Sequence, residues 1–417
     1  MKILWLCNAP LSDSKIKTTG SWLQPMAEML NEQNNVELVI VSQQKRLISV
    51  VENRINGIHQ YILPQKGAKN YGQIPSDKSI GYVRNILRKE SPDIVHIWGT
   101  EQIWAYMNVE GCFNDIPVLL EIQGLLYACV PYYYGGLTLK EQLQSIHFKE
   151  LIMPWRTLFG KKRSFRKRGE SEKRAICSFR HIGCTTQWVE NHIKTIHPGA
   201  TIHKSKIMLR NKFYQDLKWE YKFSGGHPIV YTMCSDAISY KGLHVLLKAL
   251  CIVKKRFPDV ELRIAGNMKV GNLYLDGYSI FIDNLIKHYS LQENVTFLGP
   301  INEDSIVDEL SKADVGVVPS FVETYCLALA EMMIAGLPTV VSYTSGMADL
   351  VTDKTEVLFY NPIDHVTCAS NIVKLITDRE LATSLSVNGK KKRLPLSNKA
   401  DVVNRQMEIY ERVIQDK

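Results

Sequence analysis

The sequence contains no uninterrupted apolar run long enough to cross a membrane as a helix. Such a span needs about 18 or more apolar residues, and no run in the 417 residues approaches that length. The first five residues, MKILW, read as the beginning of a strand rather than as a signal peptide. We therefore expect a cytoplasmic protein.

Paired cysteines are also missing. The nine cysteines are scattered along the chain, and no two of them form a C-x-x-C pair. This spacing argues against a disulfide framework and against a zinc site. We expect reduced, mostly buried thiols, with no bound metal and no cofactor.

Helical and strand patterns alternate along the chain, and this order predicts parallel α/β sheets. A length of 417 residues suggests two or three domains of about 100 to 200 residues each. The strands expected in the first half are Lys2 to Cys7, Val36 to Ser42, Asp93 to Gly99, Pro117 to Gln123 and His181 to Thr185. The helices expected between them are Trp22 to Gln33, Ser79 to Lys89 and Gln187 to Ile196. The pattern restarts at Pro228 after a Ser-Gly-Gly break, which predicts a linker near residues 212–227.

Positive charge is concentrated in the first half of the chain. The net charge is +9, with 29 Lys and Arg against 17 Asp and Glu in residues 1–215, and 22 against 25 in residues 216–417. Much of the excess lies in residues 151–174, in and just after the apolar run Leu151 to Phe159. Two interpretations remain: this segment binds an anionic membrane surface, or it is a solvated helix face. A nucleic-acid partner is disfavoured, because no binding motif and no interleaved aromatics accompany the charge.

Two carboxylates eight residues apart, Glu323 and Glu331, mark a candidate ligand site. Val315 to Val318 reads as a buried strand, Glu323 falls in the loop after it, and Thr324 to Ala335 has helical composition. Ligands of open α/β sheets lie beyond the carboxyl ends of the strands, where a helix N-terminus attracts phosphate. The alternative is that Glu323 complements the helix dipole and Glu331 is a solvated helix residue.

The stretch from Pro319 to Ser342 resembles the donor-binding signature of retaining glycosyltransferases with the GT-B fold, in particular family 4. Its pattern is P-S-x-x-E, seven residues, then E, followed by A-G-L-P-T-V-V-S. The resemblance implies two Rossmann-like, parallel-sheet domains facing across a cleft. They would be an N-terminal acceptor domain (1–215) and a C-terminal nucleotide-sugar donor domain (216–397), with a helix (398–417) returning to the N-terminal domain.

The resemblance also assigns roles to single residues. It implies that Glu323 contacts the donor sugar, that Glu331 contacts the ribose, and that Lys241, in a Lys-Gly step at a helix start, lies on the diphosphate. The backbone amides that would approach sugar and phosphate are those of Thr324, Tyr325, Cys326 and Leu327. Gly20 matches a family glycine before the first helix and could present amides to a phosphate, although an ordinary turn explains it equally well.

The sequence departs from the family pattern at several positions. No Lys or Arg occurs in residues 228–240, where family members usually carry an Arg. Cys326 stands where Gly is common, and Gln123 stands where many members have a His near the transferred sugar. An amide at that position can hydrogen-bond but cannot change its charge. His96 lies on a strand where members often have His, so it either lines the cleft or is a buried core histidine.

The resemblance implies a metal-independent hexosyltransferase that acts with retention. The departing diphosphate itself takes the proton of the acceptor hydroxyl, and Lys241 with helix amides stabilises the charge, since the sequence has no D-x-D motif. The acceptor would be a surface glycan or lipid-linked glycan, met at the inner face of the plasma membrane, and residues 124–160 form an irregular segment suited to bind it. The alternative is a non-catalytic GT-B protein that binds a nucleotide or sugar, favoured by the missing Arg and by Gln123.

Overall fold

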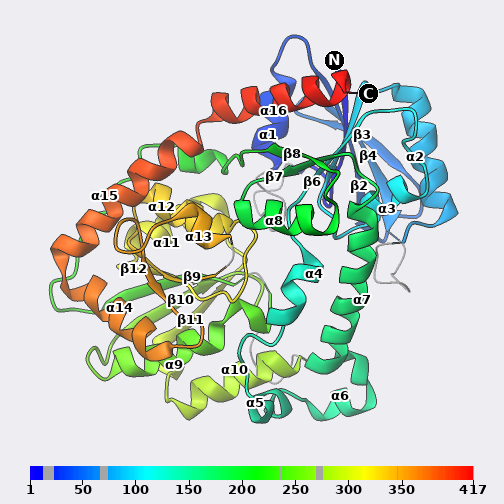
Figure 1. Cartoon of the computed structure of the whole chain (residues 1–417). Helices are drawn as coiled ribbons and strands as arrows, with labels where there is room; N and C mark the ends of the chain where they lie inside the picture. The colour runs from blue at the N-terminus through cyan, green and yellow to red at the C-terminus, as the bar shows by residue number, and fades with distance from the viewer. Residues whose placement is uncertain (13–22, 66–73, 235, 269–275, 345, 417) are drawn as a thin grey trace. The chain divides into compact units, whose positions relative to one another are not determined.

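An eight-stranded sheet with the order β3-β4-β2-β1-β5-β6-β7-β8 forms the centre of the first of two compact units (Figure 1). A computed structural model describes residues 1–12, 23–65, 74–234, 236–268, 276–344 and 346–416. The N-terminal unit comprises Met1–Ala128, Phe165–Met208 and Leu396–Lys417, and the C-terminal unit comprises Cys129–Ser164 and Leu209–Pro395. The chain enters the C-terminal unit twice, at Cys129 and again at Leu209; the second entry lies near the predicted boundary after residue 215. Residues 129–164, expected in the N-terminal domain, group with the C-terminal unit instead.

The strands of the N-terminal unit pair in parallel, apart from β3, which is antiparallel to β4. Their bounds are β1 Lys2–Leu6, β2 Glu37–Lys45, β3 Val51–Ile55, β4 Ile58–Gln65, β5 Ile94–Trp98, β6 Val118–Glu121, β7 His181–Cys184 and β8 Thr201–Lys204. The five strands expected in this half are confirmed, and β3, β4 and β8 are additional. The turn between β3 and β4 is Asn56-Gly57 with φ of 50° and 80°, as a two-residue hairpin turn requires.

Helices flank this sheet, and their apolar faces complete its core. They are α1 Leu23–Asn31, α2 Asp77–Glu90, α3 Trp104–Val109, α8 Gln187–Ile196, α16 Lys399–Gln415 and the later part of α7 Leu158–Ile176. Tyr410 of α16 is fully buried and accepts a hydrogen bond from Trp5 Nε1 of β1 at 2.9 Å. The last helix therefore packs within the N-terminal unit.

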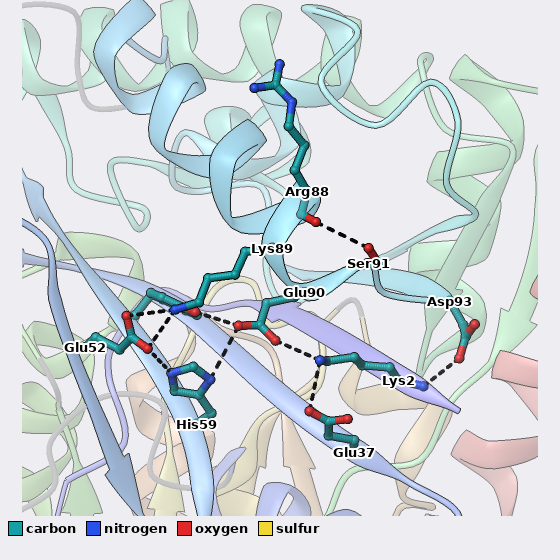
Figure 2. A network of polar contacts seen from close by, with 10 residues as sticks. Lys2, Glu37, Glu52, His59, Arg88, Lys89, Glu90, Ser91 and Asp93 are labelled. Atoms are coloured by element: carbon teal, nitrogen blue, oxygen red, sulfur yellow. Dashed lines mark hydrogen bonds and ion pairs between the residues drawn. The ribbon is translucent and has the colours of Figure 1, made fainter.

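A polar network fixes the C-terminal end of α2 to the neighbouring strands (Figure 2). Lys2 Nζ lies 2.8 Å from Glu90 Oε2 and 2.9 Å from Glu37 Oε1. Burial of Glu90 is the largest single effect and would raise its pKa, but the hydrogen bonds from Lys2 and Tyr61 and the positive charge of Lys2 together outweigh it and lower the pKa. Glu52 joins the network through His59 Nε2 at 2.8 Å and Lys89 Nζ at 3.0 Å.

The C-terminal unit holds a six-stranded, all-parallel sheet with the order β11-β10-β9-β12-β13-β14 (Figure 1). The strands are β9 Ile229–Met233, β10 Glu261–Ala265, β11 Val295–Gly299, β12 Val315–Val318, β13 Thr339–Ser342 and β14 Leu358–Tyr360. The helices are α9 Leu243–Lys254, α10 Gly277–His288, α11 Glu303–Lys312, α12 Leu327–Ala335, α13 Met347–Leu350, α14 His365–Thr377 and α15 Arg379–Leu396. The predicted fold class of two parallel-sheet α/β domains is confirmed.

Residues 129–164 form short helices rather than the irregular segment expected for 124–160. They are η1 Val130–Tyr132, α5 Leu139–Gln144, α6 Phe148–Ile152, η2 Pro154–Arg156 and the start of α7, and α4 Leu126–Cys129 precedes them. Glu141 Oε1 pairs with Lys248 Nζ at 2.6 Å, and Glu150 Oε1 accepts the Gly277 amide at 3.1 Å. These contacts to α9 and α10 explain why the segment belongs to the C-terminal unit. Among the described helices of the whole chain, none is both long and apolar enough to span a membrane.

Candidate functional site

The strand order of the C-terminal unit places a topological switch point between β9 and β12. From β9 the chain adds β10 and β11 on one side and β12 to β14 on the other. The carboxyl ends of strands at such a point are where open α/β sheets bind ligands. Lys241 follows β9 and Glu323 follows β12, so topology alone brings two of the predicted site residues to this position.

A glycine allows the loops after β9 and β12 to approach closely. Gly242 has φ of 73°, and a Cβ there would lie 1.9 Å from the Pro319 carbonyl oxygen. The Phe321 amide also donates to the Tyr240 carbonyl oxygen at 2.7 Å. A side chain at position 242 would therefore separate the loops that carry Lys241 and Glu323.

Lys241 and Glu323 form an ion pair, with Nζ 2.6 Å from Oε1. The Ser320 hydroxyl donates to the same Glu323 oxygen at 2.6 Å. Burial is the largest single effect and disfavours the charged form of Lys241, but Glu323, together with Tyr240 and Cys326, outweighs it and raises the Lys241 pKa. The site therefore presents a permanent cation held by a carboxylate.

The segment after Glu323 follows an unusual backbone path. Helix α12 begins at Leu327 rather than at Thr324 as predicted, and its N-cap Cys326 is left-handed with φ of 69°. Cys326 thus adopts the conformation that a glycine takes most easily, which accounts for the glycine common at this position. Burial raises the pKa of the Cys326 thiol, and the carboxylate of Glu323 adds to this.

Tyr325 and the backbone of Glu323 and Thr324, next to Cys326, make contacts inside the C-terminal unit. The Arg393 guanidinium of α15 donates to the Tyr325 hydroxyl, and both residues are buried. Gly346 N donates to the Glu323 carbonyl oxygen at 3.0 Å, and a Cβ at Gly346 would lie 2.4 Å from the Thr324 carbonyl oxygen. The Tyr325 side chain is thus engaged within the C-terminal unit.

Glu331 is buried in α12 and pairs with Arg210. Arg210 Nε lies 2.7 Å from Glu331 Oε1, and Arg210 Nη2 donates to Oε2, so the contact is bidentate. Burial raises the pKa of Glu331, and Arg210 opposes this increase. The solvated-helix alternative for Glu331 is wrong, since only 3% of the residue is exposed. Sequence reasoning missed Arg210, which is 121 residues away from Glu331 and belongs to no recognised motif.

The N-terminal candidates have different surroundings. His96 of β5 is fully buried, with its Nδ1 2.7 Å from the Tyr410 hydroxyl and its ring centroid 4.0 Å from that of Trp98. Burial holds the His96 pKa well below its usual range. The structure thus places His96 as a core histidine with no exposed atom. Gly20 lies outside the described residues.

Gln123 follows β6, next to a carboxylate that sequence reasoning missed. A Cβ at Gly99 would lie 3.3 Å from Gln123 Oε1 and 2.1 Å from Glu101 Oε2. Asn8 Nδ2 donates to Glu101 Oε2 at 3.4 Å, and burial raises the Glu101 pKa. Glu101 follows β5, which neighbours β1 at the switch point of this sheet. That topology, with glycines at 99 and 124 in the sequence, was the signal that could have identified it.

No group of three or more His, Cys, Asp or Glu side chains among the described residues is arranged to hold a metal ion. All nine cysteines are free thiols, and six of them are buried.

Comparisons with known proteins centre on the C-terminal half. Residues 217–392 match the model of the family described as Glycosyl transferases group 1. The chain is 31% identical over 175 residues to the uncharacterized glycosyltransferase YqgM of Bacillus subtilis, which is 42% of this chain and 46% of that protein. It is 29% identical over 146 residues to D-inositol 3-phosphate glycosyltransferase of Paenarthrobacter aurescens, 34% of each chain. The aligned part thus spans less than half the length of each of these relatives.

Solved structures resemble the chain over its whole length. Sucrose-phosphate synthase from Thermosynechococcus elongatus has a TM-score of 0.73 and 17% identity, covering 100% of both chains. Anabaena HepE in complex with UDP-glucose has a TM-score of 0.67 and 14% identity, covering 99% of both chains. These likenesses show that the chain has the GT-B fold.

Proposed function

We propose that this chain is a glycosyltransferase that moves a hexose from a nucleotide-diphosphate sugar to a glycan or lipid-linked glycan with retention of configuration. The observation that carries the proposal is the Lys241–Glu323 pair at the switch point between β9 and β12. The family match over residues 217–392 supports it, as does the likeness to HepE, whose structure was solved with UDP-glucose. The site of action we propose is the cytoplasmic face of the plasma membrane.

The pair suits a reaction in which negative charge develops on a leaving diphosphate. A lysine ammonium has three N–H donors and no acceptor. Lys241 can therefore keep its contact with Glu323 while donating to phosphate oxygens, and the N-terminal amides of α12 add a partial positive charge. The Glu323 carboxylate, which lies beside Lys241, can accept a hydrogen bond from a hydroxyl of the donor sugar. Such fixed groups stabilise the transition state without a metal ion.

In the proposed step the bond between the anomeric carbon and the diphosphate oxygen breaks, and the acceptor oxygen bonds to the same face of that carbon. The acceptor proton passes to the leaving diphosphate, so no protein carboxylate forms a covalent intermediate. Glu331 binds the hydroxyls of the nucleotide ribose. A carboxylate offers about four lone-pair sites, and Arg210 uses one on each oxygen. One site on each oxygen is left for the two ribose hydroxyls.

The second candidate is a non-catalytic GT-B protein that binds a nucleotide sugar. Two features favour it. No basic residue occurs in residues 228–240, and Gln123 stands where a histidine is common in the glycosyltransferase family that the sequence resembles. Hydrolysis of the donor separates the candidates, because a transferase without an acceptor slowly passes its sugar to water, whereas a binding protein does not.

The test begins with a thermal-shift panel of nucleotide sugars on the full chain. A donor at 100 times its dissociation constant adds about 2.7 kcal/mol of apparent stability. The donor identified in this way is then followed by NMR for hydrolysis or transfer, and for the anomeric configuration of the product. We expect one nucleotide sugar to stabilise the chain and to yield product with retained configuration in EDTA. Stabilisation without turnover supports the binding protein, and no stabilisation by any nucleotide sugar refutes both candidates.

A further inference from the structure

Large apolar side chains are exposed along residues 139–155 of the C-terminal unit. Ile152 is 80% exposed, Leu151 71%, Phe148 66% and Trp155 64%, and Leu139 and Leu143 of α5 are also exposed. Leu139 and Leu143 are four residues apart, as are Phe148 and Ile152, so each pair lies on one face of its helix. Figure 1 draws α5, α6 and the beginning of α7 in neighbouring parts of the ribbon.

This surface is held firmly on its unit. A Cβ at Gly277 would lie 1.7 Å from the Ser145 carbonyl oxygen, so the start of α10 packs directly on the end of α5. Lys161 pairs with Asp276, the N-cap of α10. A Cβ at Gly160 would lie 2.2 Å from the Pro154 carbonyl oxygen, so the first turn of α7 packs on η2. The apolar side chains are thus exposed on a packed scaffold.

The exposed charged side chains of residues 129–164 are of one sign. Residues 129–164, all of which the structure describes, contain six Lys or Arg and only two acidic residues. Both acids face inward: Glu141 pairs with Lys248, and Glu150 is buried with its oxygens on the amides of Gly277 and His147. The exposed cations of this segment are Lys140, Lys149, Arg156 and Arg163.

We propose that the face formed by α5, α6 and η2 docks on an anionic lipid bilayer. Apolar side chains from short helices would enter the boundary between headgroups and acyl chains, with Trp155 at the depth that tryptophan favours. Exposed Lys and Arg nearby would lie among anionic headgroups. A second copy of the chain suits the face less well, because a two-fold interface would place the same cationic patch against itself. This surface extends the predicted membrane segment 151–174 upstream, and it is independent of the proposed transfer reaction.

The structure also divides the predicted segment. Leu158 is buried, and Phe159 is only 36% exposed. Beyond residue 164, α7 belongs to the N-terminal unit, where Glu172 is buried and Arg168 Nη2 donates to the Glu101 carbonyl oxygen at 3.4 Å. The exposed anchors therefore precede α7 rather than lying along it.

The test is sedimentation of the full chain with vesicles of phosphatidylcholine alone or of equal parts phosphatidylcholine and phosphatidylglycerol. We expect binding to the anionic vesicles only. It should weaken as ionic strength rises from about 0.1 M to about 1 M, since the Debye length falls from about 10 Å to about 3 Å. The variant Leu151→Ser/Ile152→Ser/Trp155→Ser should lower the partition coefficient by about tenfold or more. Its matched control, Ile363→Ser/Val366→Ser/Val387→Ser, removes three exposed apolar side chains elsewhere on the same unit and should leave the coefficient unchanged.

A second measurement locates the contact. Brominated lipids should quench part of the tryptophan fluorescence of the parent, and Trp155→Phe should abolish most of that quenching while still binding vesicles. Equal sedimentation of the parent and the 151/152/155 variant with anionic vesicles overturns the proposal. So does a control variant that loses as much vesicle binding as the 151/152/155 variant. A parent that dimerises in solution, with a monomeric 151/152/155 variant, also overturns it, because the face would then be an interface between copies.

Discussion

Arg210 and Glu331 hold each other through two parallel hydrogen bonds inside the C-terminal unit, with Nε 2.7 Å from Oε1. Only 10% of the Arg210 side chain and 4% of the Glu331 side chain are exposed. The ribose-binding role proposed for Glu331 thus depends on a guanidinium that orients the buried carboxylate and opposes the rise that burial causes in its pKa. Arg210 is a positioning residue in this proposal.

The first prediction concerns this pair. Glu331→Met should lower the free energy of unfolding by about 3 to 5 kcal/mol, because it leaves Arg210 buried without a counter-charge. The double variant Arg210→Met/Glu331→Met should cost clearly less than the sum of the single changes. Urea unfolding of the four proteins checks this, and additive costs would contradict the coupling.

Recognition of the nucleotide ribose should depend on the same Arg210–Glu331 pair. The parent should prefer a ribonucleotide to its 2′-deoxy analogue, since a hydrogen bond to a charged group is worth about 1.5 to 3 kcal/mol. In Arg210→Met this preference should shrink, and in Arg210→Lys it should recover in part because the charge returns. Calorimetric titration measures both affinities. A preference that survives unchanged in Arg210→Met would remove Arg210 from ribose recognition.

Sequence reasoning located Glu323 well because its signals are local. The apolar run Val315 to Val318 forms β12, Glu323 lies in the loop after it, and α12 ends at Ala335 with Gly336 as its C-cap. The start of α12 was placed three residues too early, at Thr324, because composition does not reveal that Cys326 adopts a left-handed φ. The Asn56-Gly57 step is a local signal of the same kind, since this dipeptide is typical of a two-residue hairpin turn.

Contacts between residues far apart in the chain could not be predicted. Glu150 caps the Gly277 amide across 127 residues, and this contact helps to join residues 129–164 to the C-terminal unit. Neither residue lies in a periodic sequence pattern that would identify the other as its partner. Arg210 is a similar case, since a single arginine near a predicted linker carries no information about which carboxylate it meets.

The next prediction concerns chemistry at Lys241. If this ammonium stabilises the departing diphosphate, Lys241→Met should lower turnover by about 10²- to 10³-fold. Donor affinity should fall less, because the interaction strengthens as charge develops in the transition state. Single-turnover kinetics and donor titration separate the two quantities. Equal losses in turnover and affinity would make Lys241 a binding residue only, and activity that is lost in EDTA and restored by Mg²⁺ would contradict the metal-independent step.

At Cys326 we expect the usual order of stability of a glycine and an alanine variant to be reversed. At an ordinary helix position glycine is less stable than alanine by about 1 kcal/mol. At φ of 69° an L side chain itself costs about 1 to 2 kcal/mol, and glycine avoids that cost. Cys326→Gly should therefore be more stable than Cys326→Ala, as judged by urea unfolding. A less stable glycine variant would show that the left-handed conformation carries no strain.

The final prediction is a pH dependence that arises in the N-terminal unit. Burial raises the pKa of Glu121 to about 8 from 4.5, and the Ser205 hydroxyl, which donates to Oε1, only partly opposes this. Between these two values the unfolded chain binds fewer protons than the folded one, so stability falls as pH rises from about 5 to about 8. Glu121→Gln does not titrate and should flatten that fall, by an amount of the order of a few kcal/mol. Glu172, whose pKa burial raises to about 7, acts in the same direction, so a residual slope should remain.

The control is Glu110→Gln, which changes an exposed glutamate of the same unit and should keep the full slope. Calorimetric unfolding at several pH values compares the parent with the two variants. If Glu121→Gln loses stability with pH as steeply as Glu110→Gln does, Glu121 is ionised in the folded unit at neutral pH and the proposed origin of the dependence is wrong.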